Sequence, residues 1–468
     1  MVHLVLLGGA PQLLPARIQM AFTLGIHIIL VPFGVAFPAI ALLANDRGLR
    51  KGDPEALRLA RRWSKAMAVL FAVGAVTGTV LSFEMGLLWP GLMGRFGGVF
   101  GLPFAVEGIF FFAEAIFIAI YIYGWERLSP RAHLWSGAPI VLSGIGGSAS
   151  VIAANAWMNT PQGFRLASDG SVVDVHPLDA FFTPAFGYEF AHMLLAAYMI
   201  AGFMVASVYA MGMLRGRRDR YHRLGFLIPF VVAAIATPLQ IVAGDFAARG
   251  IYQDQPIKFA AQELVTRTST HVPETLGGVL IDGEVRYGIK IPSLASILAG
   301  FGPGTRITGL ESAPRIDRPP ANLVHLAFDV MVAVGFLLLG LVAWLALSWW
   351  RRRDLPRSRW FLRAATLAGA ASVLALEAGW IVTEVGRQPW IVYGVMRTSE
   401  AVTTSPAIWG SFTVVVAVYA ALAITAVLVL RGMSARWQRD EADEAGLPYG
   451  PRLRFGPEGL TDDTGGRP

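Results

Sequence analysis

The chain contains nine apolar runs, each long enough to cross a lipid bilayer, and this pattern permits few folds. A transmembrane helix needs roughly 17–25 predominantly apolar residues, because lipid offers no partner to an exposed backbone N–H or C=O group. The runs cover residues 18–43, 65–88, 103–124, 137–157, 185–214, 224–245, 323–349, 361–384 and 406–430. We therefore predict an all-α integral membrane protein with about nine transmembrane helices.

Composition supports this class and excludes several kinds of site. Of the 468 residues, 54% are hydrophobic and 15% are charged, and the mean hydropathy is +0.54. The net charge of +7 does not indicate nucleic-acid binding, because the arginines lie between apolar runs rather than on a basic surface rich in aromatics. The absence of cysteine excludes disulfides, thiolate zinc sites, iron–sulfur clusters and covalently attached c-type haem. Any metal must use histidine, methionine or carboxylate ligands.

The basic residues predict the orientation of the chain. They follow the first, third, fifth, seventh and ninth apolar runs, whereas the alternate connections are poor in them. Connections rich in Lys and Arg usually remain in the cytoplasm. We expect the N-terminus outside and the C-terminus in the cytoplasm.

The runs divide the chain into five parts. Residues 1–17 form an external lead-in, 18–245 the first six spans, 246–322 an external loop, 323–431 the last three spans and 432–468 a cytoplasmic tail. The loop is much longer than a connection requires, which suggests a function. The tail is rich in Asp, Glu, Gly and Pro and is predicted to be disordered.

Several ionisable or metal-binding side chains fall at a similar depth, in the outer half of the predicted spans. An ionisable group in a span costs several kcal/mol unless it has a partner or a function. A lone histidine is often satisfied by a backbone carbonyl, and a lone methionine usually only packs. Together they match the ligands of haem iron: a His/Met pair suits a low-spin haem, and a single ligand leaves a position for oxygen. The group comprises His27, Glu107, Glu114, His192, Met331, Glu377 and Glu384.

Other patterns carry less weight. The glycine-rich stretch Gly144–Ser150 lies inside a span, where small residues favour close helix packing rather than phosphate binding. His325 lies at the outer mouth of the seventh span, and its role stays open. The remaining histidines are predicted to be solvated; these are His3, His133, His176, His222 and His271.

Seven stretches of the sequence are similar to subunit I of the cytochrome bd-type quinol oxidases. The most specific is "EAGWIVTEVGRQPWIVYGVMRT", and "GDFAARGIYQDQPIKFAAQE" resembles the family's quinol-binding loop. The others are "ARIQMAFTLGIHIILVP", "GLPFAVEGIFFFAE", "AANAWMNTP", "YEFAHMLLAAY" and "LAFDVMVAVGFLLL". The similarity extends from about Arg17 to Arg431.

The resemblance implies three haems. His192 and Met331 would be the axial ligands of a low-spin haem b. His27 and Glu384 would each hold one of two further haems, namely a high-spin haem b and an oxygen-reducing haem d or third haem b.

The resemblance also implies roles around these ligands. Glu107 and Glu114 resemble acids associated with proton delivery and haem contact. Trp380 and Glu377 would line the haem region, and Arg387 would offset haem propionates.

In the external loop, Lys258 and Glu263 match residues that bind and deprotonate quinol. The implied function is a quinol:oxygen oxidoreductase of the bacterial inner membrane that forms water and separates charge. The implied partners are quinol, O2, an all-helical subunit II and a small single-span subunit. Two alternatives stay open: a transporter with an acidic relay, and a haem-binding electron-transfer protein that does not reduce oxygen.

Three departures from the family pattern suggest a divergent branch, either cyanide-insensitive or lacking haem d. Glu107 and Glu114 are seven residues apart, where the family usually has eight. Asp329 stands where the family normally has arginine, and Glu84 is a shifted substitute for polar residues at the end of the second span.

Overall fold

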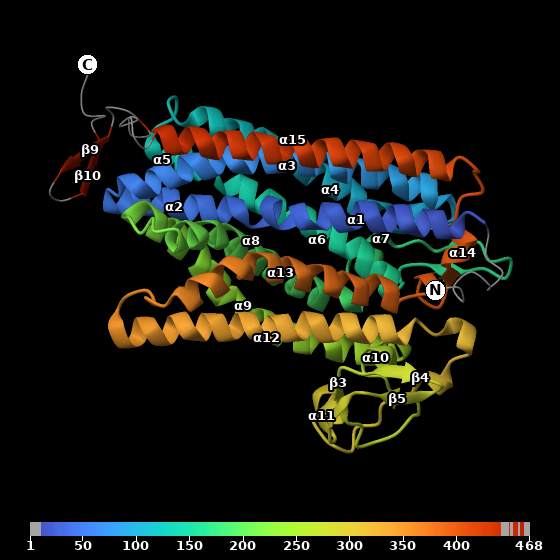
Figure 1. Ribbon diagram of the computed structural model, residues 1–468. Helices are drawn as coiled ribbons and strands as arrows, with labels where there is room; N and C mark the ends of the chain where they lie inside the picture. Colours follow the sequence, from blue (N-terminus) through green and yellow to red (C-terminus); the bar gives the residue numbers. More distant parts are fainter. Residues whose placement is uncertain (1–10, 441–448, 450–452, 457–458, 463–468) are drawn as a thin grey trace.

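Long helices that run along one common axis form most of the computed structural model (Figure 1), which describes residues 11–440, 449, 453–456 and 459–462. Within these residues, nine helical segments are long and apolar enough to span a membrane, as predicted. They are α1 (Leu13–Val35) with α2 (Phe37–Lys51), α3 (Pro54–Leu88), α4 (Pro90–Gly124), α5 (Pro130–Ser136) with α6 (Ala138–Asn159), α8 (Pro184–Leu214), α9 (Arg220–Asp254), α12 (Ala321–Arg352), α13 (Arg359–Gly386) and α15 (Ile408–Asp440).

Local sequence signals account for many helix ends. Proline, which lacks an N–H group, occupies the first turn of α2, α3, α4, α5, α6 and α8. The side chains of Ser129, Asp219 and Ser358 cap α5, α9 and α13 by accepting backbone N–H bonds. The first span is broken at Ala36 because Pro38 cannot continue the backbone ladder of α1 into α2.

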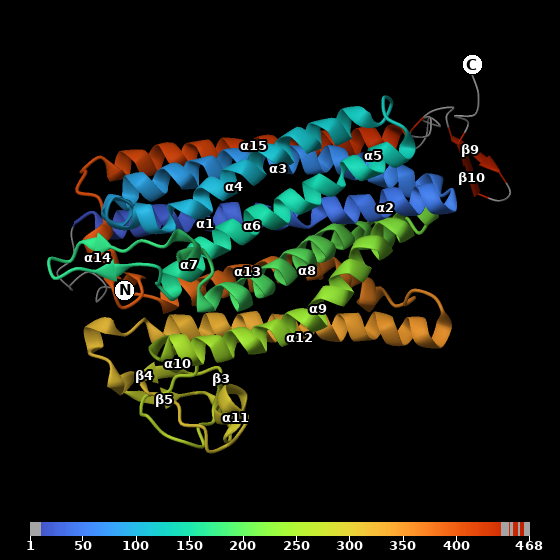
Figure 2. The ribbon, with the colours of Figure 1, turned by 180° about the vertical axis from the view of Figure 1, so that it is seen from behind.

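The spans pack in two groups of four helices (Figures 1 and 2). One group consists of α1, α3, α4 and α6, and the other of α8, α9, α12 and α13. Helix α15 covers α1 and α3 from outside, while α8 and α13 contact α1 and join the groups. Phe203, Phe230 and Phe361 are fully buried in the core of the second group.

The long loop forms a small folded unit beside one end of α12, at the same end of the bundle as the start of α1 (Figure 1). It contains α10 (Pro256–Gln262), two antiparallel strand pairs, α11 (Leu294–Gly300) and two 3-10 turns, Leu310–Ser312 and Arg315–Asp317. In the loop, β3 (Glu274–Leu276) pairs with β6 (Ile289–Ile291), and β4 (Val279–Ile281) with β5 (Glu284–Arg286). Elsewhere the short elements are α7 (Pro177–Phe181), α14 (Thr398–Ala401), β1 (Arg165–Leu166), β2 (Val172–Val173), β7 (Trp390–Val392) and β8 (Met396–Arg397).

At the opposite end of the bundle, Asp53 joins two arginine-rich connections. Arg220 Nη2 and Arg47 Nε donate to its carboxylate at 2.7 and 3.2 Å. Burial opposes ionisation, but these two arginines hold the pKa of Asp53 below its usual value. The contact ties the turn between α2 and α3 to the start of α9.

The structure corrects several predicted boundaries and environments. Helix α9 continues to Asp254, so the loop begins at residue 255 rather than 246, and α15 extends beyond 431 to Asp440. Part of the tail predicted to be disordered forms a hairpin of β9 (Leu453–Gly456) and β10 (Gly459–Asp462).

Two histidines predicted to be solvated are buried. His133 is fully buried and stacks on Tyr121 with ring centroids 4.3 Å apart, while His222 Nδ1 lies 2.6 Å from Asp219 Oδ2. His133 finds its partner inside the bundle, and His222 pairs with Asp219 at the start of α9. His176 and His271 are exposed as predicted, and His3 lies outside the described residues.

The tight contact between α8 and α9 yields a stability prediction. A Cβ atom on Gly202 would lie 2.6 Å from the carbonyl oxygen of Pro229. Gly202→Val should therefore lower the melting temperature of the purified complex in detergent, by an amount equivalent to about 1–3 kcal/mol of overpacking. Gly340→Val, at an exposed α12 position with no heavy atom within 4 Å, should melt like the wild type. Equal melting temperatures for the two variants would contradict this packing.

Candidate functional site

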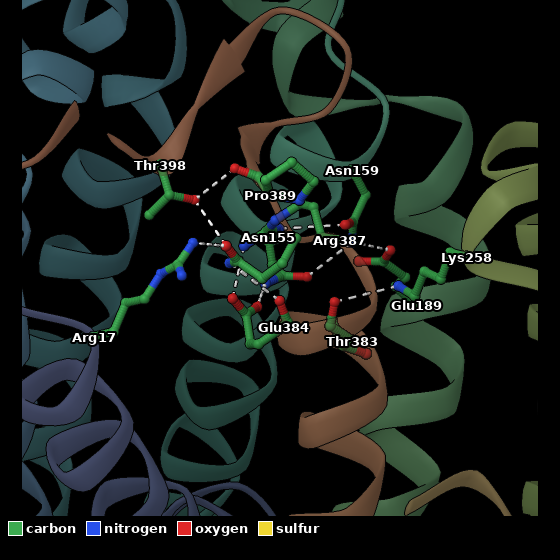
Figure 3. Close-up of polar contacts among 11 residues, drawn as sticks. Arg17, Asn155, Asn159, Glu189, Lys258, Thr383, Glu384, Arg387, Pro389 and Thr398 are labelled. Carbon is green, nitrogen blue, oxygen red and sulfur yellow. Dashed lines mark hydrogen bonds and ion pairs between the residues drawn. The ribbon is translucent and has the colours of Figure 1, made fainter. Parts of the chain in front are cut away.

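The end of α13 carries a partly buried ion pair between Glu384 and Arg387 (Figure 3), in which the Glu384 side chain is 28% accessible. Arg387 Nη2 donates to Glu384 Oε2 at 2.6 Å, and Asn155 Nδ2 of α6 donates to Glu384 Oε1 at 2.6 Å. Arg387 is 2% exposed. Both carboxylate oxygens of Glu384 are thus oriented by fixed donors.

From Glu384 the network continues across α6 to α8. Asn155 and Asn159 are one helical turn apart, and Asn159 Nδ2 lies 3.1 Å from Asn155 Oδ1 and 2.7 Å from Glu189 Oε1. Arg387 Nη1 donates to Asn159 Oδ1 at 3.3 Å. A continuous set of polar contacts therefore connects Glu384 with Glu189.

Lys258 of α10 approaches this network from the loop (Figure 3). Its side chain is 2% exposed, and Nζ donates to the Thr383 carbonyl oxygen at 3.4 Å. A Cβ atom on Gly386 would lie 3.0 Å from Lys258 Cε, so glycine leaves room for the lysine. The pKa of Lys258 is lowered to about 8, mainly because the side chain is buried. The nearby carboxylate of Glu189 opposes this shift.

A second branch of the network joins the start of α1 to the chain after α13. Arg17 Nη2 donates to Gln388 Oε1 at 2.5 Å, and Thr398 Oγ1 donates to the same oxygen at 3.0 Å. Thr398 Oγ1 also lies 3.0 Å from the Pro389 carbonyl oxygen. The residues that follow α13 are therefore held against both α1 and α14.

His27 and two acids lie along α1. His27 Nδ1 is 2.8 Å from Thr77 Oγ1 of α3, and a Cβ on the neighbouring Gly78 would lie 3.0 Å from its ring. Glu377 Oε2 and Glu114 Oε1 lie 3.4 and 3.8 Å from Cβ positions built on Gly25 and Gly34 of α1. Glu114 is 8% exposed, whereas Glu107, two turns away on α4, is half-buried.

His192 and Met331 belong to the second group of helices. Gly244 of α9 faces the His192 ring and Gly379 of α13 faces Met331 Sδ, with built Cβ atoms at 3.3 and 3.0 Å. Gln240 Nε2 lies 3.2 Å from each ring nitrogen of His192. Trp380 packs against the core of this group. A glycine thus stands beside each of these two side chains, as beside His27.

The donor set fits haem better than a bare metal ion. Among the described residues, no cluster of three or more His, Asp or Glu side chains could hold an ion. Haem iron needs only one or two protein ligands, and a glycine faces each of His27, His192 and Met331, where a larger residue would press on the side chain. His27, His192, Met331 and Glu384 are the side chains that could hold it.

The sequence missed several residues of the site. Glu189 and Glu274 received no role, although Glu189 is a carboxyl group inside a predicted span and could have been noticed for that reason. Asn155 and Asn159 lay in a recognised stretch but were assigned no function. The structure also gives His325 a place: it is fully buried between the loop and α12.

Comparisons with known proteins agree with the geometry. A family profile described as "Cytochrome bd terminal oxidase subunit I" matches residues 15–437. A Bacillus subtilis (strain 168) protein provisionally named cytochrome bd menaquinol oxidase subunit I is 37% identical over 429 residues, covering 90% of this chain and 96% of that protein. The cytochrome bd ubiquinol oxidase subunit 1 of the same organism is 30% identical over 407 residues, covering 84% and 86%. A solved structure of the bd oxidase from Geobacillus thermodenitrificans superposes with a TM-score of 0.85 and 37% identity, covering 92% of this chain and 100% of that chain.

The ion pair of Arg387 gives a testable consequence. Arg387→Gln leaves Glu384 without its charge partner. Because the Glu384 side chain is 28% accessible, the loss should be smaller than the roughly 3–5 kcal/mol that breaking a fully buried pair costs, but larger than that of an exposed pair. The melting temperature of the purified complex should fall markedly. Arg165→Gln provides the control, because Arg165 and Asp174 form an exposed pair with side chains 67% and 58% accessible, and such pairs contribute about 0–1 kcal/mol. Equal losses in the two variants would show that the Glu384–Arg387 pair adds no special stability.

Proposed function

The chain belongs to the cytochrome bd terminal oxidase subunit I family. We propose which of its residues serve quinol oxidation and which serve oxygen reduction. The protein is a haem-containing, multi-pass subunit of a bacterial terminal respiratory oxidase that uses quinol and O2. This function is better supported than the transporter or the electron-transfer protein without oxygen reduction.

One observation carries the proposal. Glu384, a candidate haem ligand, and Lys258, a candidate quinol residue, meet in one buried network through Asn155, Asn159 and Glu189 (Figure 3). Lys258 is the loop residue that reaches this network, through the Thr383 carbonyl oxygen and the charge of Glu189. A quinol bound beside Lys258 would therefore lie close to the helices that carry the haem ligands.

His192 and Met331 would bind a low-spin haem b that receives electrons from quinol. Imidazole and thioether together saturate the iron, which suits electron transfer. Gly244 and Gly379 support this assignment, because they keep backbone, without side chains, next to both ligands.

His27 and Glu384 would each hold one of two further haems, a high-spin haem b and haem d or a third haem b. When bound, these haems supply the iron at which oxygen is reduced. Asn155 and Arg387 orient Glu384, and Thr77 orients the His27 ring. Trp380 and Glu377 would line this region.

Glu107 and Glu114 would deliver protons toward the oxygen site. Glu114 supports this role because it is buried and its Oε1 has no hydrogen-bond partner among the described residues. That free oxygen faces Gly34 of α1, in the same helix as His27.

Lys258 and Glu263 would bind and deprotonate quinol at the outer face. Protons for water would come from the opposite, cytoplasmic side, so charge is separated without pumping. We expect an all-helical subunit II and a small single-span subunit to complete the complex.

Visible spectra test the assignment of the low-spin ligands. His192→Ala or Met331→Leu should remove the low-spin band from the dithionite-reduced complex while leaving the other haem bands. His176→Ala, at an exposed histidine, is the control. Survival of the low-spin band in both ligand variants would refute the assignment.

The same preparation tests the function as a whole. Reduced-haem bands, carbon monoxide binding and quinol-driven oxygen uptake are expected together. Complete absence of haem would favour a transporter, and haem without carbon monoxide binding would favour an electron-transfer protein.

The pKa of Lys258 predicts a pH dependence. The ammonium form can donate a hydrogen bond to a quinol oxygen, and its fraction falls as the pH rises through about 8. The KM for quinol should then rise, approaching about tenfold per pH unit. Glu189→Gln should move this rise to lower pH, because the carboxylate that raises the pKa of Lys258 is gone.

Two variants check this prediction. Lys258→Ala should raise the KM at neutral pH with little change in haem content, and should abolish the pH-dependent rise. Lys290→Met, at an exposed lysine of the same loop, should behave like the wild type. A pH profile in Lys258→Ala that matches the wild type would count against the quinol role of Lys258.

A further inference from the structure

A pair of buried carboxyl groups joins two distant parts of the loop. Glu263 follows α10, and Glu274 begins β3; they are 6% and 8% exposed. Their carboxyl groups are hydrogen-bonded to each other. Apart from that bond, neither Oε2 atom has a partner among the described residues. A hydrogen bond between two carboxyl groups needs a proton on one of them, so this contact favours retention of one proton by the pair.

The surroundings of the pair favour proton uptake. Burial raises the pKa of Glu263 well above its usual value, and the neighbouring Glu274 raises it further. Burial also raises the pKa of Glu274. From α12, Asp329 faces both glutamates and His325 faces Glu274, whereas Lys258 faces Glu189, Arg387 and Glu384 instead. These shifts make the pair a better proton acceptor than an exposed glutamate.

His325 holds this part of the loop against α12. Its Nδ1 lies 2.6 Å from the carbonyl oxygen of Gln262, the residue before Glu263, and its Nε2 lies 2.8 Å from the carbonyl oxygen of Gly277. Nε2 is also 3.3 Å from Asp329 Oδ2. The histidine thus bridges the two chain segments that carry the carboxyl pair.

Two further residues on the same face of α12 complete the attachment. Asp329 Oδ2 accepts the Gly277 N–H at 2.6 Å, and Asn322 Oδ1 accepts the Leu280 N–H at 2.6 Å. Gly277 and Gly278 have φ angles of +65° and +92°, which only glycine adopts easily, and they turn the chain from β3 toward β4. Glu274 is therefore held firmly beside Glu263.

A purely structural role does not explain two acids at this place. An amide at either position would make the same hydrogen bond without the electrostatic cost of burying a second carboxyl group. The pair also has two free acceptor atoms, which a structural contact would not need.

We propose that Glu274 is a second proton-accepting residue for quinol oxidation and acts as a pair with Glu263. This rests on the proposed assignment of the loop as the quinol site. Quinol loses two O–H protons and two electrons to become quinone, and the electrons leave through the haems to O2. Each O–H bond breaks with transfer of its proton to the pair, which holds one proton at rest and two after uptake. The pair returns one proton to water at the loop surface before it accepts the next.

The test compares two electron donors on the purified complex. Glu274→Gln keeps the size and hydrogen bonding of the side chain but cannot accept a proton. Oxygen uptake driven by a short-chain quinol should fall about 10- to 100-fold, within the range for loss of a general base. Oxygen uptake driven by tetramethyl-p-phenylenediamine, which donates electrons without releasing protons, should stay within about twofold of the wild type. The reduced-haem spectrum should be unchanged.

The pH profile separates proton uptake from a structural effect. The pair accepts its second proton at the lower of its two coupled pKa values, because the hydrogen bond from Glu263 lowers the pKa of Glu274. Glu274→Gln leaves Glu263 as a single acceptor without this coupling, so the acid limb of the remaining quinol-driven rate should move to higher pH. Glu284→Gln is the matched control, since Glu284 is in the same loop with its side chain 77% accessible.

Each outcome decides the proposal. Quinol-driven rates within twofold of the wild type, or an unmoved acid limb, overturn it. If Glu274→Gln loses haem, Glu274→Asp takes its place: a retained quinol-driven rate supports the pair, and loss of that rate with haem present refutes it. A normal KM in Lys258→Ala would instead show that the quinol site itself is wrongly assigned.

Discussion

The ion pair between Glu384 and Arg387 connects most of what is distinctive in this structure. A guanidinium that is 2% exposed at the end of a membrane span is tolerable only with a carboxylate beside it. Because Arg387 also reaches Asn159, the pair determines how α6 meets α13, and Asn159 in turn reaches Glu189 of α8. The loop joins this arrangement through Lys258. Four parts of the chain thus meet at one charge-compensated point.

Helix α13 presents side chains or glycines to both groups of spans. It carries Glu377 and Glu384, which face the first group, and Gly379, which clears space for Met331 in the second. The same device recurs at His27 and His192, where Gly78 and Gly244 face the ring. At each position the glycine lets the facing helix approach the side chain closely, because a Cβ atom there would lie 3.0 to 3.3 Å from it.

The first turns of α12 give the loop its position. His325 and Asp329 bind the loop's backbone, and the same helix presents Met331 two residues later. Asp329 therefore has a visible structural role, since its carboxylate accepts the Gly277 N–H group. The proposed quinol loop and the proposed low-spin haem ligand Met331 are linked through this one helix.

The sequence by itself determined the nine spans, because hydrophobic length and proline position act locally along the chain. It also singled out His27, His192, Met331 and Glu384 among the ionisable or metal-binding groups inside apolar runs, and the family resemblance implied their roles as haem ligands. It failed for His133 and His222, for the start of the loop at residue 255, and for Glu189 and Glu274. Whether a polar side chain is solvated or buried against a partner depends on residues far away in the chain, such as Asn159 for Glu189 and Glu263 for Glu274. Only the tertiary structure decided those pairings, because electrostatic and hydrogen-bond energies depend on distance in space and not on separation in sequence.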